Sequence, residues 1–429
     1  MSTALLTDRY ELTMIDAAIA SGRHNRQSIF EVFARRLPEG RRYGIVAGTG
    51  RLLEAIEQFR FTDAELTWLK DNGVVTAATL DWLANYRFTG TIWGYAEGEA
   101  YFPNSPILVI EGTFAEAVVL ETLTLSVLNY DSAVASAASR MVSAADGRPL
   151  AEMGSRRASE RSAVAAARAA WIAGFGASSN LEAGRRYDIP TMGTAAHAFT
   201  LLHDSEEEAF RAQVAALGSG TTLLVDTYDV TAAVDLAVRV AGTTLGAVRI
   251  DSGDLPAQVA AVRAQLDSLG AVNTKITVTN DLDEYTIAAL RAAPVDSYGV
   301  GTSVVTGSGH PASGMVYKLV SRVDDEGNWV DVAKKSTAKA TVAGRKYPMR
   351  TLVDGVATAE TIHLDEPGPE DAGRPLLVPL ITDGVTDPRY TGTAGAARAR
   401  THRAASVAEL PAGAFRLSRG EPAIPTVYV

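Results

Sequence analysis

Short apolar runs recur through the middle of the chain, and a polar stretch follows most of them. The runs lie near residues 150, 172, 190, 222, 247, 275, 296 and 316, with helical patterns between several of them. Intervals of roughly 20–30 residues are typical of successive strand–helix units and favour a parallel sheet covered by helices. Eight runs predict an α/β barrel over residues 148–321. The short gap between 172 and 190, and the weak helical pattern near 300–315, predict an irregular barrel.

The residues before this region have a different pattern and predict a separate domain over residues 1–147. A helix is expected from Thr7 or Asp8 to Gly22, a strand over 28–33, and helices over 48–59, 63–72 and 77–86. Residues 88–114 have the turn signals of strands, and 116–145 predicts one long helix or two. The third segment, 322–429, contains hairpin-like pieces, a basic stretch from Lys334 to Lys346 and a tail rich in Gly and Pro.

Seven consecutive predicted strands end in polar or glycine-rich stretches. Because the carboxyl ends of barrel strands meet on one face, this succession predicts a catalytic face, although each stretch alone is weak. The stretches are 154–157 (Gly-Ser-Arg-Arg), 176–180 (Gly-Ala-Ser-Ser-Asn), 193–197 (Gly-Thr-Ala-Ala-His), 226–229 (Asp-Thr-Tyr-Asp), 251–254 (Asp-Ser-Gly-Asp), 279–281 (Thr-Asn-Asp) and 299–303 (Gly-Val-Gly-Thr-Ser).

Residues 247–255 form the central stretch, in which a short buried strand leads directly into two carboxylates. Arg249, Asp251 and Asp254 together favour a functional site at the carboxyl end of this strand. The two aspartates suit ribose hydroxyls or a hydrated magnesium ion, because hard cations take oxygen ligands. For Asp254 alone, capping of the following helix is an equally good interpretation.

Two of the other stretches suit anions. Residues 299–303 can offer backbone N–H groups and hydroxyls to a phosphate, with a plain tight turn as the alternative. Arg156 and Arg157 suit a carboxylate or a phosphate through bidentate hydrogen bonds, with a solvated helix start as the alternative.

His197 follows a turn of small residues among these strand ends. No group of histidines and carboxylates has a convincing transition-metal spacing. The functional options for His197 are therefore general acid–base or nucleophilic catalysis. A structural role is the alternative, because a lone histidine is more often structural.

Composition narrows the class of protein. The chain has 429 residues, of which 47% are hydrophobic and 21% charged, and this favours a soluble protein with two well-packed domains. A net charge of −10 argues against a nucleic-acid partner, so any anionic substrate would need locally focused basic residues. We find no signal peptide and no apolar run long enough to span a membrane. The lack of cysteine excludes disulfides and thiolate metal sites and fits a cytoplasmic enzyme.

Five motifs, in the family's order, closely resemble nicotinate phosphoribosyltransferase, a type II phosphoribosyltransferase. The likeness extends from residue 7 to about residue 346. The motifs are Thr7-Asp8-x-Tyr10-Glu11-Leu12-Thr13-Met14, Gly154-Ser155-Arg156-Arg157, Gly193-Thr194-x-x-His197, Arg249-x-Asp251-Ser252-Gly253-Asp254 and Tyr298-Gly299-Val300-Gly301-Thr302.

This resemblance implies an irregular α/β barrel joined to an α/β sandwich. The sandwich would be formed by the N-terminal segment, with part of residues 322–429 returning to it. The implied reaction transfers phosphoribose from 5-phosphoribosyl pyrophosphate to nicotinate, giving nicotinate mononucleotide and pyrophosphate in NAD biosynthesis. ATP would be a co-substrate, hydrolysed through a phosphorylated His197. Magnesium is expected because the substrates carry pyrophosphate, and no ligand motif for it is assigned.

The resemblance also implies roles for individual residues. Tyr10 would stack on the pyridine ring across the interface of a homodimer, and Arg156 or Arg157 would face the carboxylate. Residues expected to bind the 5-phosphate are Gly299, Gly301 and Thr302. Residues expected at the ribose and pyrophosphate are Arg249, Asp251, Asn280 and Asp281, and the same motifs add Thr194, Ser252 and Asp254 as substrate-binding residues.

Two positions depart from the family's pattern, and other functions compete. Met153 stands where an aromatic residue is expected, so the second face of the ring has no assigned partner, and Asp131 stands where an amide is usual. Nicotinamide phosphoribosyltransferase is the nearest alternative, but paired arginines favour a carboxylate over an amide. Chain length and His197 disfavour a quinolinate enzyme. Lys275 and Lys318 are poorly placed for a lysine-dependent barrel aldolase, and a non-catalytic binding protein would not need His197.

Overall fold

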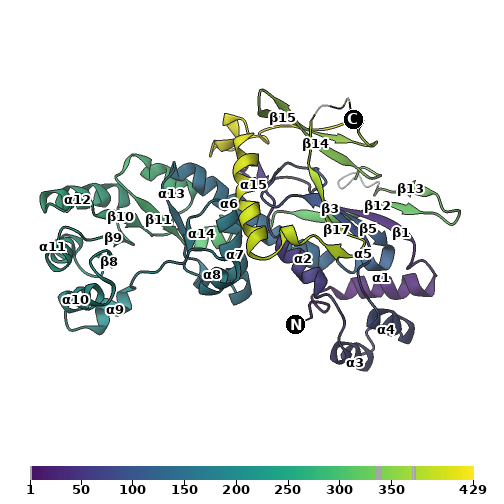
Figure 1. Cartoon of the computed structure of the whole chain (residues 1–429), viewed down its shortest axis with the longest axis horizontal. Coiled ribbons are helices and arrows are strands. Elements are labelled where there is room, and N and C mark those ends of the chain that lie inside the picture. The colour runs from purple at the N-terminus through teal and green to yellow at the C-terminus, as the bar shows by residue number, and fades with distance from the viewer. Residues whose placement is uncertain (1, 335–340, 370, 372) are drawn as a thin grey trace. The chain divides into compact units, whose positions relative to one another are not determined.

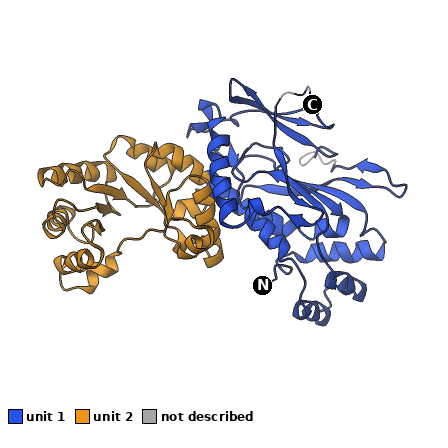
Figure 2. Ribbon diagram, viewed as in Figure 1, with its two compact units in different colours: residues 1–136, 310–429 blue, residues 137–309 orange. Residues whose placement is uncertain are grey.

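The computed structural model describes residues 2–334, 341–369, 371 and 373–429, and it divides the chain into two compact units (Figure 2). Unit 1 contains residues 1–136 and 310–429, and unit 2 contains residues 137–309. Both units combine helices and sheets, so the α/β class expected from the sequence is confirmed. Across the described residues, every helix is too short or too polar to cross a lipid bilayer.

A seven-stranded antiparallel sheet lies at the centre of unit 1 (Figure 1). Strand β1 (Gln27–Ala34) pairs with β12 (Met315–Val323) on one side and with β5 (Leu108–Thr113) on the other. Strands from both ends of the chain therefore share one sheet. The full order is β13 (Trp329–Asp331), β12, β1, β5, β3 (Thr91–Tyr95), β17 (Leu377–Thr382) and β18 (Val385–Thr386).

Both faces of this sheet are covered, which explains why nearly all of β1 is buried. Successive side chains of a strand point to opposite faces. Phe30 and Val32 accordingly join the main core, whereas Ile29 packs with Val109 and Val320 in a small second cluster. The main core also takes residues from α1 (Arg9–Ala20), α2 (Thr49–Glu57), α3 (Asp63–Asp71), α4 (Ala77–Ala84), α5 (Phe114–Val118) and the first part of α6 (Glu121–Ala145).

Two smaller sheets and a long helix complete unit 1. One sheet has the order β16 (Arg374–Pro375), β14 (Tyr347–Val353), β15 (Val356–His363) and β19 (Thr426–Tyr428), and the other pairs β2 (Gly44–Ile45) with β4 (Ala100–Tyr101). Helix α15 (Gly392–Ala408) lies between β18 and β19 in sequence. Of the basic stretch expected from Lys334 to Lys346, residues 335–340 lie outside the described residues. At its end, Lys346 forms a buried ion pair with Glu31 at 2.7 Å.

A six-stranded parallel sheet lies at the centre of unit 2. Its order is β7 (Ala177–Ser178), β6 (Leu150–Glu152), β11 (Ser297–Val300), β10 (Lys275–Val278), β9 (Ala247–Ile250) and β8 (Thr222–Leu224). Residues of these strands are mostly buried, as is usual where helices follow parallel strands. The helices are α7 (Glu160–Ile172), α8 (Leu181–Tyr187), α9 (His197–Leu202), α10 (Glu206–Leu217), α11 (Val230–Ala241), α12 (Leu255–Ser268), α13 (Glu284–Ala289) and α14 (Thr302–Val305).

The order in which the strands pair is that of a barrel, except that one junction between neighbouring strands is not made. The last strand, β11, pairs with the first, β6, and Thr191 extends the sheet beyond β7 through an isolated parallel bridge to Ser178. Within residues 137–309, all of which are described, no ladder joins Thr191 to β8. A closed irregular barrel therefore stays a prediction.

Three of the apolar runs do not form the barrel strands that were expected for them. The run near 172 is the end of α7, whose buried side is almost entirely alanine, and the run near 190 forms only the bridge at Thr191. A short apolar run has the same pattern in a buried helix as in a strand, which explains the first error. The run near 316 is a strand, β12, but it pairs with β1 in unit 1.

The unit boundaries fall earlier in the chain than the expected boundaries at 147 and 321. Helix α6 continues through the first boundary, after residue 136, so no linker marks it in the sequence. The second boundary follows residue 309, because β12 belongs to the antiparallel sheet. Residues 310–429 are part of the same unit as the N-terminal segment.

A buried charge cluster connects the N-terminal and C-terminal segments within unit 1. Glu99, which is almost fully buried, accepts hydrogen bonds from Arg374 at 2.8 and 3.0 Å, from His402 Nε2 at 2.8 Å and from the Ser406 hydroxyl. Burial alone would raise the pKa of Glu99, but the donors from His402 and Arg374 hold that pKa well below its usual range.

Replacing Glu99 should therefore destabilise unit 1. We expect Glu99→Gln to cost roughly 1.5–3 kcal/mol at pH 7, because it removes the carboxylate that Arg374 and His402 share, while Arg374 keeps Glu409 as a second partner. A depressed pKa gives stability that is present above the unfolded value, near pH 4.3, and is lost as the pH falls towards the folded value. The difference between the two proteins should thus shrink only below about pH 4. Thermal unfolding followed by circular dichroism across this pH range measures it, with exposed Glu57→Gln as control. Equal midpoints for Glu99→Gln and the control would contradict the prediction.

Candidate active site

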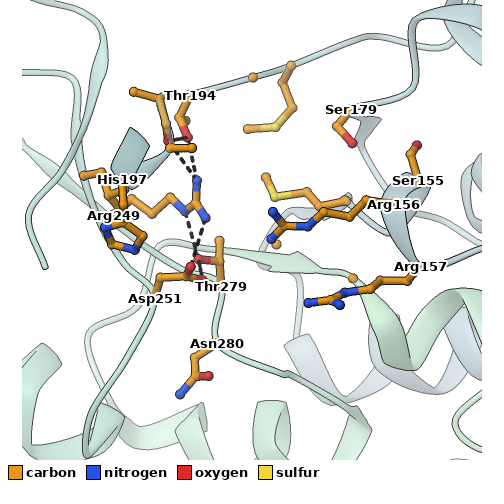
Figure 3. Close-up of a pocket in the computed structure, with 18 of the residues that line it drawn as sticks. Ser155, Arg156, Arg157, Ser179, Thr194, His197, Arg249, Asp251, Thr279 and Asn280 are labelled. Carbon is orange, nitrogen blue, oxygen red and sulfur yellow. Dashed lines mark hydrogen bonds and ion pairs between the residues drawn. The ribbon is translucent and has the colours of Figure 1, made fainter. Parts of the chain in front are cut away.

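A cavity of about 500 Å³ opens in unit 2 among the turns that follow the parallel strands. Parallel strands all end at the same edge of their sheet, so residues far apart in sequence meet there. Figure 3 shows its charged side chains on two sides, with Arg156 and Arg157 on one and Arg249, Asp251 and His197 on the other. The predicted site residues that line the cavity are Arg156, Arg157, Thr194, His197, Arg249, Asp251, Asn280, Asp281, Gly299, Gly301 and Thr302.

Arg249 connects three of the turns around the cavity. From β9 its guanidinium donates to Thr194 Oγ1 at 2.8 Å, to the Ala195 carbonyl at 3.3 Å and to Thr279 Oγ1 at 2.9 Å. It also lies 3.4 Å from the carboxylate of Asp251, which accepts a hydrogen bond from Thr279 at 2.5 Å (Figure 3). With only 14% of its side chain exposed, Arg249 has a fixed position and offers a positive charge that is partly compensated.

Arg156 and Arg157 form the second positive group. They stand in a short 3₁₀ turn, Ser155–Arg157, directly after β6, and both are exposed. In the described part of the chain neither guanidinium has an ion-pair partner. Two exposed guanidinium groups facing a cavity are suited to an anionic ligand, because each can make paired hydrogen bonds to a carboxylate or phosphate.

His197 is the first residue of α9 and is contacted from the strand end after β8. Its Nδ1 lies 3.1 Å from Thr227 Oγ1, and its Nε2 lies 3.9 Å from Asp226 Oδ1. The Asp226 side chain is only 2% exposed, and its Oδ1 has no hydrogen-bond partner among the described residues. Its Oδ2 accepts from the Asp251 N–H at 2.9 Å and the Ser252 hydroxyl at 2.7 Å. Asp226 is therefore fixed on one side and faces the histidine on the other.

The last two strand ends contribute backbone as well as side chains. A methyl group at Gly299 would meet Met153 Sδ and Thr279 Cγ2 at 2.7 Å, so close packing requires glycine there. At Gly301 the nearest atom would be 3.5 Å away, so packing does not require glycine, and its backbone is open to a ligand. Asp281 has a φ of 31°, an uncommon left-handed conformation, and it ends a turn in which Thr279, Asn280 and Asp281 all line the cavity.

Sequence motifs alone did not identify several residues of this site. Asp226 and Thr227 belong to one of the polar strand ends, but the motifs assigned neither residue a role. Side chains that line the cavity without an assigned role are Met153, Ser155, Ser179, Met192, Leu224 and Thr279. No three His, Asp or Glu side chains of the described residues are close enough to form a ready-made metal site.

Comparison with known proteins identifies the family. The model of the nicotinate phosphoribosyltransferase N-terminal domain matches residues 5–129, and the model of the nicotinate phosphoribosyltransferase family matches residues 149–354. The chain belongs to the nicotinate phosphoribosyltransferase family. Nicotinate phosphoribosyltransferase pncB1 of Mycobacterium tuberculosis is 56% identical over 440 residues, which cover 98% of this chain and 94% of that protein. Nicotinate phosphoribosyltransferase of Bacillus subtilis is 38% identical over 362 residues, covering 82% and 74%.

The fold agrees with that of a solved structure. Human nicotinic acid phosphoribosyltransferase matches with a TM-score of 0.82 at 25% sequence identity, over 99% of this chain and 97% of that chain. The similarity extends through residues 350–429, where the sequence motifs gave no match.

Three of the residues that the sequence predicted to bind substrate do not line the cavity. Asp254 caps helix α12 by accepting from the Ala257 N–H, so the capping interpretation describes its contact. Ser252 is turned towards Asp226, to which it donates. Tyr10 belongs to unit 1, where it lies on α1 with 46% of its surface exposed. Their expected contacts with substrate stay predictions.

Proposed function

We propose that the protein transfers phosphoribose from 5-phosphoribosyl pyrophosphate to nicotinate, forming nicotinate mononucleotide and pyrophosphate in NAD biosynthesis. The observation that supports this most is the cavity itself, in which Arg156 and Arg157 lie across one space from Arg249. An acceptor carboxylate and a donor rich in phosphates both need such cations, although the chain as a whole is acidic. Family membership and the names of the relatives agree with this substrate pair.

The chemistry requires little of the protein beyond binding and charge. The lone pair of the pyridine nitrogen attacks C1 of the ribose, the bond from C1 to the pyrophosphate oxygen breaks, and pyrophosphate leaves with both electrons. The pyridine nitrogen carries no proton at neutral pH, so no general base is needed. Positive charge develops on the sugar in the transition state, and catalysis rests on orientation and electrostatics. Asp251, held beside Arg249, is suitably charged to stabilise that cationic sugar.

Each part of the donor would have its own group of residues. Gly301 and Thr302, with Gly299 packed behind them, would bind the 5-phosphate through backbone N–H groups and a hydroxyl. Arg249 and Thr194 would contact the pyrophosphate, and Asn280 and Asp281 the ribose hydroxyls. Arg156 or Arg157 would pair with the nicotinate carboxylate, which makes nicotinamide the poorer acceptor.

Magnesium fits the oxygen donors of this cavity. Mg²⁺ typically binds one or two protein carboxylates together with substrate phosphates and water, so the lack of a three-residue cluster does not conflict with it. Asp251 and Asp281 would hold it, and it would neutralise charge on the leaving pyrophosphate. Arg249 would orient the same pyrophosphate from the protein side.

The contacts of His197 suit it to become phosphorylated by ATP. Its side chain lines the cavity and is 42% exposed, and its ring contacts Thr227 and Asp226 behind it. With Nδ1–H donating to Thr227 Oγ1, the lone pair of Nε2 would be free to accept a phosphoryl group. The Asp226 carboxylate, 3.9 Å from Nε2, would stabilise the positive charge that the ring then gains. Transfer of the γ-phosphoryl group to His197 would release ADP, and hydrolysis of the phosphohistidine would couple this energy to nucleotide formation, as in a ligase.

A product assay tests the function directly. Purified protein with 5-phosphoribosyl pyrophosphate, Mg²⁺ and nicotinate should form nicotinate mononucleotide, and added ATP should increase the yield and appear as ADP. Nicotinamide should react at least about tenfold less efficiently, because it cannot accept a charge-assisted pair of hydrogen bonds. Chromatography of the nucleotide products measures both reactions. Preferential formation of nicotinamide mononucleotide would replace the proposal with the alternative acceptor.

Phosphorylation of His197 has a separate test. Incubation with ATP labelled in its γ-phosphate should leave acid-labile label on the wild-type protein and none on His197→Ala. Asp226→Asn should lower labelling roughly ten- to a hundredfold, as for other partners that orient a functional histidine. Asp229→Asn is the matched control, because asparagine caps α11 as well as aspartate does. Label that persists in His197→Ala would remove this residue from the role.

We also propose that two subunits share the active sites, with Tyr10 of one chain completing the cavity of its partner. The proposal is supported by the exposed ring of Tyr10 on a helix whose next residues, Glu11 and Leu12, are buried. Partial burial and the nearby Glu121 raise the pKa of Tyr10 to about 12, so its ring is neutral and suited to stacking on a pyridine. A two-fold homodimer would place two such composite sites.

Mixing inactive variants tests the shared site. If subunits exchange, a dimer of one Tyr10→Ala chain and one His197→Ala chain has one site with both lesions and one with neither. Activity of each mixed dimer should then recover to about half of the wild-type level. Native mass spectrometry confirms exchange, and mixtures of each variant with itself are the controls. Complete exchange without recovery would show that Tyr10 acts within its own chain.

A further inference from the structure

A buried carboxylate lies directly behind the turn that carries Arg156 and Arg157. Glu152 is the last residue of β6, and its side chain is fully buried and absent from the cavity wall. Its Oε1 accepts the Gly154 N–H at 2.5 Å, and its Oε2 accepts the Ser178 hydroxyl at 2.6 Å. Both donors are neutral, and within the described residues no cation is paired with Glu152, so its charge is stabilised by these hydrogen bonds.

The two hydrogen bonds join the ends of neighbouring strands. Gly154 begins the turn after β6, in which its carbonyl accepts the Arg157 N–H at 2.8 Å. Ser178 ends β7, and its Oγ accepts the Asn180 N–H at 2.9 Å. Asn180 in turn donates to Ser155 Oγ at 2.9 Å. The chain of contacts therefore leads from the arginine turn through Glu152 to β7 and back to the same turn.

The backbone at Gly154 is closely packed, which fixes the path of the turn that carries the two arginines. A methyl group there would meet Val305 Cγ1 at 2.2 Å and the Gly301 carbonyl at 2.8 Å, so the turn passes close to the glycine-rich end of β11. Such a tight path has little room for alternative positions. Any rotation of the turn would be amplified at the guanidinium groups, because they lie at the ends of long side chains.

We propose that Glu152 is a positioning residue for acceptor recognition: by joining the Arg156–Arg157 turn to the end of β7, it directs these guanidinium groups at the carboxylate of the acid acceptor. The proposal rests on the function proposed above and identifies the residue that gives the arginine turn its direction.

Glutamate suits this position better than glutamine. The Gly154 N–H needs an acceptor, and the Ser178 hydroxyl also needs one for its proton, since its oxygen already accepts from Asn180. A carboxylate only accepts, whereas an amide nitrogen only donates. A glutamine would therefore leave one of the two donors without a partner in a buried place. Burial raises the pKa of Glu152, and the bonds from Ser178 and Gly154 partly oppose that rise.

Steady-state kinetics of Glu152→Gln test the proposal. The KM for nicotinate should rise about tenfold, whereas the KM for 5-phosphoribosyl pyrophosphate and kcat should stay within about twofold. Ser178→Ala removes the other end of the contact and should raise the same KM by a smaller factor. Because the two residues act as one unit, the double variant should be no worse than Glu152→Gln alone. Exposed Glu182→Gln on the adjacent helix α8 is the matched control.

A second comparison shows whether Glu152 acts through the arginines. Of Arg156→Leu and Arg157→Leu, the variant with the higher KM for nicotinate defines the carboxylate partner. In that background, adding Glu152→Gln should change the KM by less than about twofold, because no directed guanidinium remains. A further tenfold increase would overturn the proposal.

Other outcomes are equally decisive. Equal increases in both KM values, or a fall in kcat alone, would show that Glu152 supports the whole cavity and not acceptor recognition. Should Glu152→Gln lose its circular dichroism spectrum, folded Ser178→Ala decides, and a wild-type KM in that variant would overturn the proposal. If wild type and Glu182→Gln both form no product from nicotinate, the proposed function fails, whatever the other variants do.

Discussion

The parallel direction of the strands in unit 2 is the constraint on which the site depends. Hydrogen bonding between parallel neighbours brings all their carboxyl ends to one edge of the sheet, so the turns that follow the strands lie together at that edge. Residues as distant in sequence as Ser155 and Thr302 thereby line one cavity. The pairing of β11 with β6 is decisive, since it brings the last strand beside the first and the glycine-rich end of β11 beside the arginine turn. Without it, the strands would form two separate sheets, with the arginine turn on one and the glycine-rich turn after β11 on the other.

Charge in this cavity is arranged locally and differs from that of the whole chain. The protein has a net charge of −10, yet three arginines line a cavity of about 500 Å³. Arg249 is tied to Asp251 and two hydroxyls, so its charge is largely committed to fixing three turns. Arg156 and Arg157 have no such ties to any residue that the structure describes, so they are the cations available for an incoming anion. The two groups thus serve different purposes, which their spacing in sequence does not reveal.

The polar strand ends predicted which residues gather at one place better than the periodicity predicted each strand. Eleven of the predicted site residues line one cavity, because glycine, arginine and carboxylate at strand ends carry information about chemistry regardless of the exact strand bounds. Periodicity failed at the run near 172, where a buried alanine-rich helix looks like a strand, and at β12, whose partner β1 lies far away in sequence. Supporting residues were missed for a different reason. Nothing in the sequence around Glu152 or Asp226 says which way a side chain points, and their contacts are made with the neighbouring strand.

Glu152 and Asp226 show a common solution to the problem of holding adjacent strand ends. Each is a buried carboxylate at the end of one strand that accepts a backbone N–H and a serine hydroxyl, with at least one donor from the next strand. A buried carboxylate is costly unless such donors surround it, so it penalises every arrangement in which the two ends separate. Apolar packing could not give the same result, because it tolerates sliding where a hydrogen bond does not. The two carboxylates differ in the residues that they face. Glu152 has both oxygens occupied and lies behind the arginine turn. One oxygen of Asp226 has no hydrogen-bond donor among the described residues, and that oxygen faces His197. One carboxylate is therefore suited to fixing the Arg156–Arg157 turn, and the other to orienting His197, the residue proposed to be phosphorylated.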